Sequence, residues 1–379
     1  MENFTIYNPV KVHFGAGVVE QLGAVIAPIH RKVLLVYGQG AIRKNGVYDL
    51  VMQQLHDAGC EVWEYGGIKS NPIIEDVDAA AELGRHNGVG VVLAVGGGSV
   101  IDSVKIIAAA IVAQCSAWDL VSRKTKPTGA LPVVTVLTLA ATGTEMNPFA
   151  VVQNQQLGIK TSFSSPYSFP VHSFLDPAFT LSVPSHYTGY GIADLMAHVM
   201  EAWFGKGDSP LADKIVVSIL QEAMEAGPQL MGHLQDYNLR ARVMYAATLA
   251  LNGTTMHGRL HGDWGVHAAG HVLSLLYGVP HGASLTIVYP TWLRLMKDRE
   301  TLRVQKLLGH LFQTTDIEDG IQKLEGFFKS INCPVRLGEL NLPATAPAEI
   351  VDQMIRNRVS GMHHQLSSED YRTLVSLME

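Results

Sequence analysis

Cysteine is scarce in this sequence, which has three cysteines, Cys60, Cys115 and Cys333, among 379 residues. Their number is odd, and no two of them form a Cys-x-x-Cys pair. A disulfide scaffold and a thiolate metal site are therefore both disfavoured. Such sparing use of cysteine fits a reducing compartment, so we expect a cytoplasmic protein.

Charge is scarce as well. Lys and Arg number 28 and Asp and Glu number 34, for a net charge of −6. No long basic run occurs, which disfavours nucleic acid as the main partner. Charged residues make up 16% of the chain, whereas about 25% is typical of globular domains. Hydrophobic residues make up 47% of the chain, enough to disfavour disorder. The low charge leaves room for large buried surfaces, such as a homo-oligomer interface.

Long uninterrupted apolar runs are missing. The most apolar stretch, residues 89–113, is broken by three consecutive glycines and by Asp102 and Lys105. A membrane-spanning helix is therefore not expected. Residues 1–12 have no basic start followed by an apolar core, so no signal peptide is expected either.

The first half of the chain alternates short β-type runs with helical patterns. This alternation, with short connections, predicts a mostly parallel sheet covered by helices. The expected strands cover residues 32–37, 61–65, 89–95 and 132–138, and the expected helices lie near 47–55, 74–85 and 100–113.

The second half has long helical patterns and little β-type alternation. We therefore predict an α/β domain over residues 1–180 and an all-helical domain over residues 181–379, with a cleft between them. The expected helices cover residues 186–204, 212–224, 240–251, 265–276 and 301–312.

A glycine-rich turn, Gly96-Gly97-Gly98-Ser99, follows the clearest expected strand and precedes a helix. Glycines let the backbone approach an anion, and a helix N-terminus offers unpaired N–H groups. This context predicts a phosphate-binding turn, although the pattern is neither G-x-G-x-x-G nor the Walker motif. The alternative is a tight strand-to-helix turn without a ligand.

Ser99 and Asp102 have the Ser-x-x-Asp spacing of a capping box, with Ser99 as the predicted N-cap. That structural role alone would account for Asp102. Alternatively, Asp102 lies near a bound nicotinamide or the substrate, and the spacing leaves both interpretations open.

Histidines gather at helical spacing in the second half. Asp194 and His198 lie four residues apart, which puts both on one helix face. Five of the sixteen histidines fall inside 25 residues: His257, His261, His267, His271 and His281. Nitrogen and oxygen donors without sulfur suit Zn²⁺, Fe²⁺, Mn²⁺ or Co²⁺, so we predict a metal site. Spacing leaves open which of the five bind, and His257 and His261 equally fit surface or interface positions.

Four motifs follow one another along the chain. They are Gly-Gly-Gly-Ser-x-x-Asp at 96–102, Thr-Leu-Ala-Ala-Thr-Gly-Thr-Glu at 138–145, Gly-x-x-Asp-x-x-x-His at 191–198, and His-x-x-x-His with a later Pro-His-Gly from 267. Together they resemble the iron-containing (group III metal-dependent) alcohol dehydrogenase family, above all its bacterial butanol dehydrogenase and aldehyde reductase branch. The likeness runs from Phe4 to the C-terminal region.

This resemblance implies a Rossmann-like dinucleotide-binding domain followed by an all-helical metal-binding domain, as in dehydroquinate synthase. It implies four metal ligands, Asp194, His198, His267 and His281. It places His271 near the nicotinamide, unligated, the pyrophosphate at Gly96 to Ser99, and Thr138 and Thr142 along the cofactor. Family members often occur as dimers, so a homodimer is expected.

Residues after the first expected strand bear on the choice of cofactor. Many NAD-using relatives carry an Asp there, whereas this chain reads Gly38-Gln39-Gly40-Ala41, with Arg43 and Lys44 close by. The missing carboxylate and the nearby cations favour the 2′-phosphate of NADP(H) over NAD(H). Lys160 is a second candidate contact for that phosphate.

The expected reaction is reversible hydride transfer between NADP(H) and a small aldehyde or primary alcohol, with the metal as a Lewis acid. His271 and Asp102 are the catalytic candidates, His271 as a proton relay. Phe149, Trp264 and Leu251 are candidates for an apolar substrate pocket.

Three other functions fit the sequence less well. A dehydroquinate-synthase-like lyase would need more cations near the helical motifs than this chain has. A metallohydrolase would leave the glycine turn unexplained. A non-catalytic nucleotide sensor would have no need of an open metal site.

Overall fold

The computed structural model describes residues 1–379, and the chain divides into two compact units. The sheet unit comprises Tyr7–Val183 and Gln235–Thr248, and the helical unit comprises Met1–Ile6, Pro184–Leu234 and Leu249–Glu379. Each unit thus includes a short segment from elsewhere in the chain. Within the helical unit, Glu2 N donates to Gly258 O at 2.9 Å. Within the sheet unit, Thr248 Oγ1 donates to Glu145 Oε1 at 2.6 Å.

The sheet unit is built on six strands in the order β1-β8-β5-β4-β2-β3, all parallel. The strands are β1 (Lys11–Phe14), β2 (Lys32–Gly38), β3 (Glu61–Ile68), β4 (Val91–Gly96), β5 (Val133–Leu137) and β8 (His172–Leu175). The chain leaves β3 and returns across β2 to form β4, so the strand order reverses between β2 and β4. In open parallel sheets, ligands bind beyond the carboxyl ends of the strands at such a reversal.

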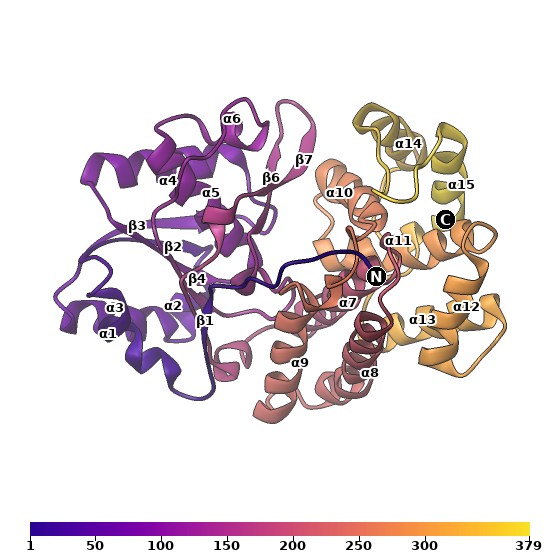
Figure 1. The fold of residues 1–379 in the computed structure, drawn as a ribbon, viewed down its shortest axis with the longest axis horizontal. Coiled ribbons are helices and arrows are strands. Elements are labelled where there is room, and N and C mark those ends of the chain that lie inside the picture. The colour runs from indigo at the N-terminus through magenta and orange to yellow at the C-terminus, as the bar shows by residue number, and fades with distance from the viewer. The chain divides into compact units, whose positions relative to one another are not determined.

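Helices cover both faces of this sheet, as Figure 1 shows. Successive residues of a strand point to opposite faces. Leu34 and Val36 of β2 therefore pack with α4, α5 and α6, and Val33 and Leu35 pack with α1, α2 and α3. The helices are α1 (Leu22–Ile26), α2 (Ala41–Lys44), α3 (Val47–Asp57), α4 (Ile74–Asn87), α5 (Gly98–Ala113) and α6 (Ala117–Val121). Burial on both faces explains why β4 is apolar throughout.

In the helical unit, α7 runs through the centre and is buried at nearly every position from Thr188 onward. Helices α8, α10 and α11 pack against it. The helices are α7 (Ser185–Trp203), α8 (Pro210–Gly232), α10 (Gly265–Tyr277), α11 (His281–Met296), α12 (Thr301–Phe312), α13 (Ile317–Ser330), α14 (Ala346–Asn357) and α15 (Ser368–Met378). Helix α9 (Tyr237–Ala250) begins in the sheet unit.

The predicted fold class, a Rossmann-like parallel-sheet domain with a helical domain, is confirmed. The sequence missed the edge pair β1 and β8, which are four residues each, and the hairpin β6 (Phe149–Asn154) and β7 (Ile159–Ser164). It also missed the short helices α1, α2 and α6, and the helices α11, α13, α14 and α15. His281, of the Pro-His-Gly motif, is the first residue of α11, after Pro280 at the N-cap.

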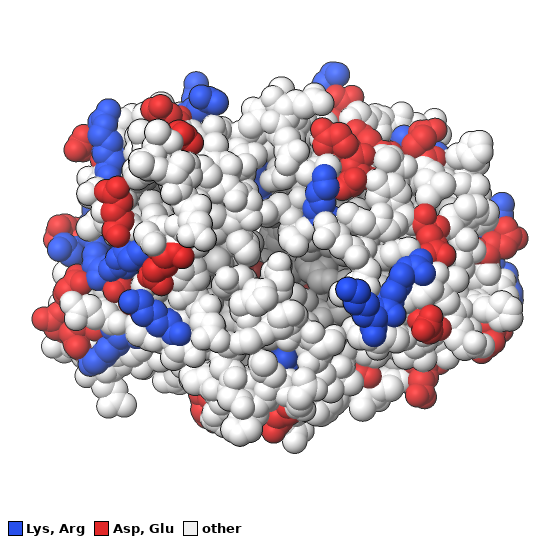
Figure 2. Space-filling model, turned by 180° about the vertical axis from the view of Figure 1, so that it is seen from behind, with Lys and Arg blue, Asp and Glu red and all other residues white.

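Positive and negative side chains are interspersed on the face shown in Figure 2, among wide areas that carry neither. That face offers no continuous basic surface of the kind that nucleic acid requires. Every helix of the structure is too short or too polar to cross a membrane.

Candidate metal and cofactor site

One carboxylate oxygen in the helical unit is surrounded by three imidazoles. Asp194 Oδ1 lies 3.6 Å from Nε2 of His198, 3.8 Å from Nε2 of His267 and 3.5 Å from Nε2 of His281. These separations are too long for hydrogen bonds. Ligands about 2.1 Å from a tetrahedral ion lie about 3.4 Å apart, close to the spacing seen here.

Three helices supply these side chains. Asp194 and His198 lie one turn apart on α7, His267 is in the first turn of α10 and His281 begins α11. Asp194 Oδ1 and His267 Nε2 are buried without a hydrogen-bond partner. Since buried polar atoms are almost always satisfied, this donor set fits a divalent ion that accepts both lone pairs.

Burial and the neighbouring charged groups together set the protonation of the donors. It lowers the pKa of His198 to about 4, with Asp194 opposing this shift and His267 adding to it. Burial alone would raise the pKa of Asp194, but the three histidines around it hold that pKa well below its usual range. Near neutral pH, Asp194 is thus a carboxylate and His198 a neutral imidazole, which are the forms that bind metal. Burial acts to lower the pKa of His267, but Asp194 and Glu201 raise it to about 9, so an ion that binds there displaces a proton from this ring.

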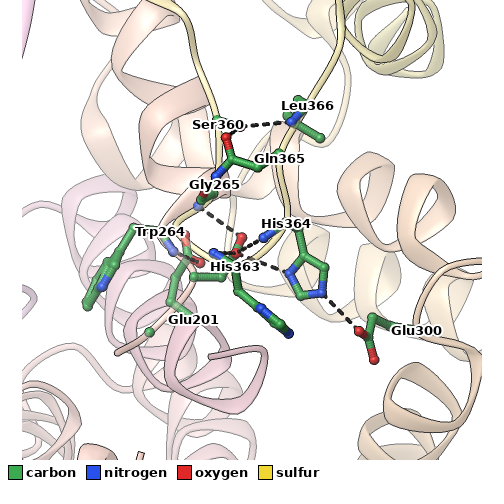
Figure 3. A network of polar contacts seen from close by, with 12 residues as sticks. Glu201, Trp264, Gly265, Glu300, Ser360, His363, His364, Gln365 and Leu366 are labelled. Atoms are coloured by element: carbon green, nitrogen blue, oxygen red, sulfur yellow. Dashed lines mark hydrogen bonds and ion pairs between the residues drawn. The ribbon is translucent and has the colours of Figure 1, made fainter. Parts of the chain in front are cut away.

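Glu201, which the sequence analysis missed, orients His267. It is fully buried on α7, two turns after Asp194. Its Oε1 lies 3.0 Å from Nδ1 of His267. Its Oε2 accepts the backbone N–H of Trp264 at 2.6 Å, a contact drawn in Figure 3. A carboxylate at Nδ1 fixes the tautomer and leaves Nε2 with a lone pair for metal. The only signal for this role in the sequence was an acidic residue in the apolar stretch that follows His198 on α7.

Glu201→Gln is expected to weaken metal binding about 10- to 100-fold, because the amide cannot hold the His267 tautomer as a carboxylate does. Competition with a chromophoric chelator measures the dissociation constant of the metal. Glu75→Gln, at an exposed position of α4, is the matched control. An unchanged dissociation constant in Glu201→Gln would contradict the orienting role.

The remaining histidines of the dense segment lie in different surroundings. The ring of His271 is half-buried, 5.5 Å from that of His281. His257 stacks on Phe4, and Nδ1 of His261 lies 3.0 Å from Gly262 O.

One of the three candidate pocket residues lies beside two of the candidate metal ligands. The Trp264 indole lies 5.4 Å from the ring of His267 and 6.3 Å from that of His198. Phe149 is exposed on β6 of the sheet unit, and Leu251 follows α9.

The two glycine turns lie at the same edge of the sheet. Gly38 ends β2 and Gly96 ends β4, and these strands pair directly. Gly40 has a φ of 105°, a conformation that side chains disfavour. A Cβ on Gly98 would lie 2.6 Å from the side chain of Thr142, so that turn admits no larger residue without a shift. The turns therefore fit the approach of a nucleotide at the β2–β4 reversal, beside the N-terminus of α5.

The predicted capping box is wrong. The N-cap of α5 is Gly97, and Ser99, already inside the helix, donates its hydroxyl to Ser70 O at 2.5 Å. Asp102 instead accepts from Thr144 Oγ1 at 2.6 Å and from Val151 N at 2.9 Å. Helix α5 begins at Gly98, two residues earlier than expected, with Gly97 extended before it.

Other candidate cofactor residues already have partners within the sheet unit. Thr138 N donates to Gly96 O at 3.0 Å, and Lys160 Nζ donates to Asn71 Oδ1 at 2.8 Å. The Arg43 guanidinium pairs with Glu64 at 2.9 Å and stacks over the Tyr48 ring at 3.8 Å. Glu64 therefore offsets part of the positive charge expected beside Gly38 to Ala41.

Known proteins match this chain along its whole length. The family model for iron-containing alcohol dehydrogenase matches residues 9–177, and that for the Fe-containing alcohol dehydrogenase family, C-terminal, matches residues 188–376. A probable NADH-dependent butanol dehydrogenase of Bacillus subtilis is 38% identical, with 99% of each chain covered. The NADPH-dependent aldehyde reductase YqhD of Escherichia coli is 32% identical, with 99% of each chain covered.

A solved structure of similar fold is the NADH-dependent butanol dehydrogenase A of Thermotoga maritima. Its TM-score is 0.95 at 35% identity, and it covers 100% of this chain and 99% of its own. With both family models matched and relatives above 30% identity over nearly the full length, this chain belongs to the iron-containing alcohol dehydrogenase family.

Proposed function

We propose that this alcohol or aldehyde oxidoreductase transfers hydride reversibly between NADP(H) and a small aldehyde or primary alcohol. The observation that carries the proposal is the ring of three imidazole nitrogens around Asp194 Oδ1 at 3.5–3.8 Å. The relatives named butanol dehydrogenase and aldehyde reductase support the substrate class.

Asp194, His198, His267 and His281 would hold one divalent ion, Zn²⁺ or Fe²⁺ with Mn²⁺ also suitable. Bound there, it supplies Lewis-acid polarisation of the substrate oxygen. A single carboxylate leaves a net charge of +1, which suits a developing alkoxide. Glu201 orients His267, and the Trp264 indole lies beside the rings of His198 and His267.

Gly96 to Ser99 would hold the pyrophosphate at the N-terminus of α5, with Thr138 and Thr142 beside it. We infer a preference for NADP(H), because residues 38–41 carry no carboxylate for the ribose 2′-hydroxyl. The Arg43–Glu64 pair makes this preference modest, and relatives are named for both NADH and NADPH. NAD(H) is therefore expected to work as well.

To test this proposal, NADPH oxidation with butanal is measured at 340 nm. The measurement is made before the bound metal is removed with a chelator, after its removal, and after Zn²⁺, Fe²⁺ or Mn²⁺ has been added back. NADH is run beside it. We expect turnover that chelation abolishes and metal restores, with kcat/KM higher for NADPH. A folded sample that binds neither cofactor would overturn the proposal, and metal-dependent ester hydrolysis without a cofactor response would favour a metallohydrolase.

We infer that His271 relays the substrate proton, since its half-buried ring neighbours that of His281 and histidine titrates near neutral pH. The same assay across pH tests this role. His271→Asn is expected to lose one limb of the pH profile. An unchanged profile would leave His271 a packing role only.

The assembly and the compartment are part of the same proposal. A homodimer in the cytoplasm is the expected state. Sedimentation equilibrium tests the dimer, and cell fractionation tests the compartment.

A further inference from the structure

A second group of metal-binding side chains lies in the helical unit, apart from the four ligands described above. The loop between α14 and α15 carries His363 and His364, and Glu300 directly precedes α12. These three residues each offer one donor atom, and the donor atoms all lie within 4.8 Å of one another. Figure 3 shows the loop bringing both histidines toward Glu300.

A buried carboxylate orients the central histidine of this group. Asp263 is fully buried, and its Oδ1 lies 3.1 Å from Nδ1 of His364. On the other side of the ring, Nε2 of His364 lies 3.2 Å from Oε1 of Glu300. This repeats the arrangement in which Glu201 holds Nδ1 of His267 and points Nε2 at the other ligands. Histidines that bind metal almost always have such a partner at the other ring nitrogen.

The loop is fixed before any ion binds. Asp263 Oδ1 also accepts the backbone N–H groups of His363 at 3.0 Å and His364 at 2.8 Å. Gly361 packs against the Asp263 carboxylate so closely that a Cβ there would lie 2.2 Å from Oδ2. The Ser360 hydroxyl accepts from Leu366 N at 2.8 Å. Such prior ordering lowers the entropic cost of binding.

We propose that His363, His364 and Glu300 form a second divalent-cation site of this chain. Two imidazoles and a carboxylate suit Zn²⁺ or a similar first-row ion, with water completing the shell. The ion replaces the proton that His364 Nε2 shares with Glu300, and that proton leaves to solvent. Its role is structural, because it ties the loop to the start of α12 and, through Asp263, to the turn that begins α10.

Competition with that proton sets the conditions of the test. Burial acts to lower the pKa of His364, but Asp263 and Glu300 act to raise it and their combined effect is larger. The ring therefore holds a proton more firmly than an ordinary histidine. Metal binding is therefore measured at pH 8, in a buffer that fixes the free Zn²⁺ concentration.

The experiment counts Zn²⁺ per chain in the full-length protein after equilibrium dialysis. We expect two equivalents in the wild type, one in His363→Ala, one in Asp194→Asn and none in the double variant. His363 is exposed, so its substitution leaves the fold intact. His56→Ala, at an exposed histidine of α3 far along the chain, is the matched control and keeps two.

A second readout is the Zn²⁺-dependent rise of the unfolding temperature in the Asp194→Asn background, which Glu300→Gln is expected to remove. The second site would be overturned if the wild type bound one equivalent of Zn²⁺, Asp194→Asn bound none and His363→Ala kept one. That result would leave the proposed function standing. Loss of one equivalent in His363→Ala but none in Asp194→Asn would support the second site and count against the first.

Discussion

Asp194→Asn is expected to lose its bound metal at the first site and about a thousandfold or more of its turnover. Asn keeps the size of the side chain but removes the charge that the three imidazoles surround. A Lewis acid contributes several kcal/mol to stabilising charge on a substrate oxygen, and about 4 kcal/mol corresponds to a factor of about a thousand. Metal content and kcat/KM with butanal and NADPH measure both effects.

The control for this variant is His257→Ala. It changes a residue of the histidine-rich segment that stacks on Phe4 rather than facing Asp194. We expect His257→Ala to keep its metal and its activity. If Asp194→Asn kept full turnover while remaining folded, the Asp194 cluster would not be the catalytic centre.

Lys105→Met is expected to have the largest effect on stability. Lys105 is fully buried on α5, and its ammonium donates to Thr144 Oγ1 at 2.6 Å, Asn147 Oδ1 at 3.1 Å and Phe149 O at 2.6 Å. Methionine fills the space but leaves all three acceptors without this donor. Removing one partner of a buried charged network typically costs about 3 to 5 kcal/mol in the free energy of unfolding.

Urea unfolding measures this loss, with Lys124→Met as the matched control. Lys124 is exposed and pairs with Asp119 at 3.1 Å. Such surface pairs contribute about 1 kcal/mol at most. Equal losses in the two variants would contradict the role of the Lys105 network.

The difference in stability between the wild type and Lys105→Met is also expected to depend on pH. Burial lowers the pKa of Lys105 from 10.5 to about 7, with Asp102 and Glu145 partly opposing it. Between these values the unfolded chain binds more protons than the folded one, so the wild type gains stability as pH rises. The stability difference between wild type and Lys105→Met is therefore expected to widen from pH 7 to pH 9. A constant difference would show that Lys105 stays fully charged over this range.

The parts of the fold that the sequence predicted are those with a strong local signal. Strand β4 is an apolar run buried on both faces, and α7 places Asp194 and His198 one turn apart. The strands that the sequence missed, β1 and β8, have four residues each and are stabilised by pairing with distant strands. A pairing between residues 11 and 172 has no local pattern that reveals it.

The same distinction holds at the site. The helical spacing of the histidines is local, so the sequence could single them out. Glu201 and His267 are 66 positions apart, and Asp263 and His364 are 101 apart. Only the packing of α7, α10 and the C-terminal loop brings these carboxylates to their imidazoles. The predicted capping box was wrong although its local pattern is present. Ser99 and Asp102 have the right spacing, but α5 begins before Ser99, so Ser99 is not at the N-cap.

The segment Gln235–Thr248 belongs to the sheet unit but is synthesised after the first part of the helical unit. Glu145 is almost fully buried in the sheet unit, and Thr248 donates to its carboxylate. When Val183 has been added, 65 further residues must follow before Thr248 exists. At typical elongation rates this takes about 3 to 13 s. During that interval the nascent sheet unit lacks the Thr248 hydroxyl that donates to Glu145. The sheet unit can therefore be completed only after more than half of the residues from α7 to α10 have been translated.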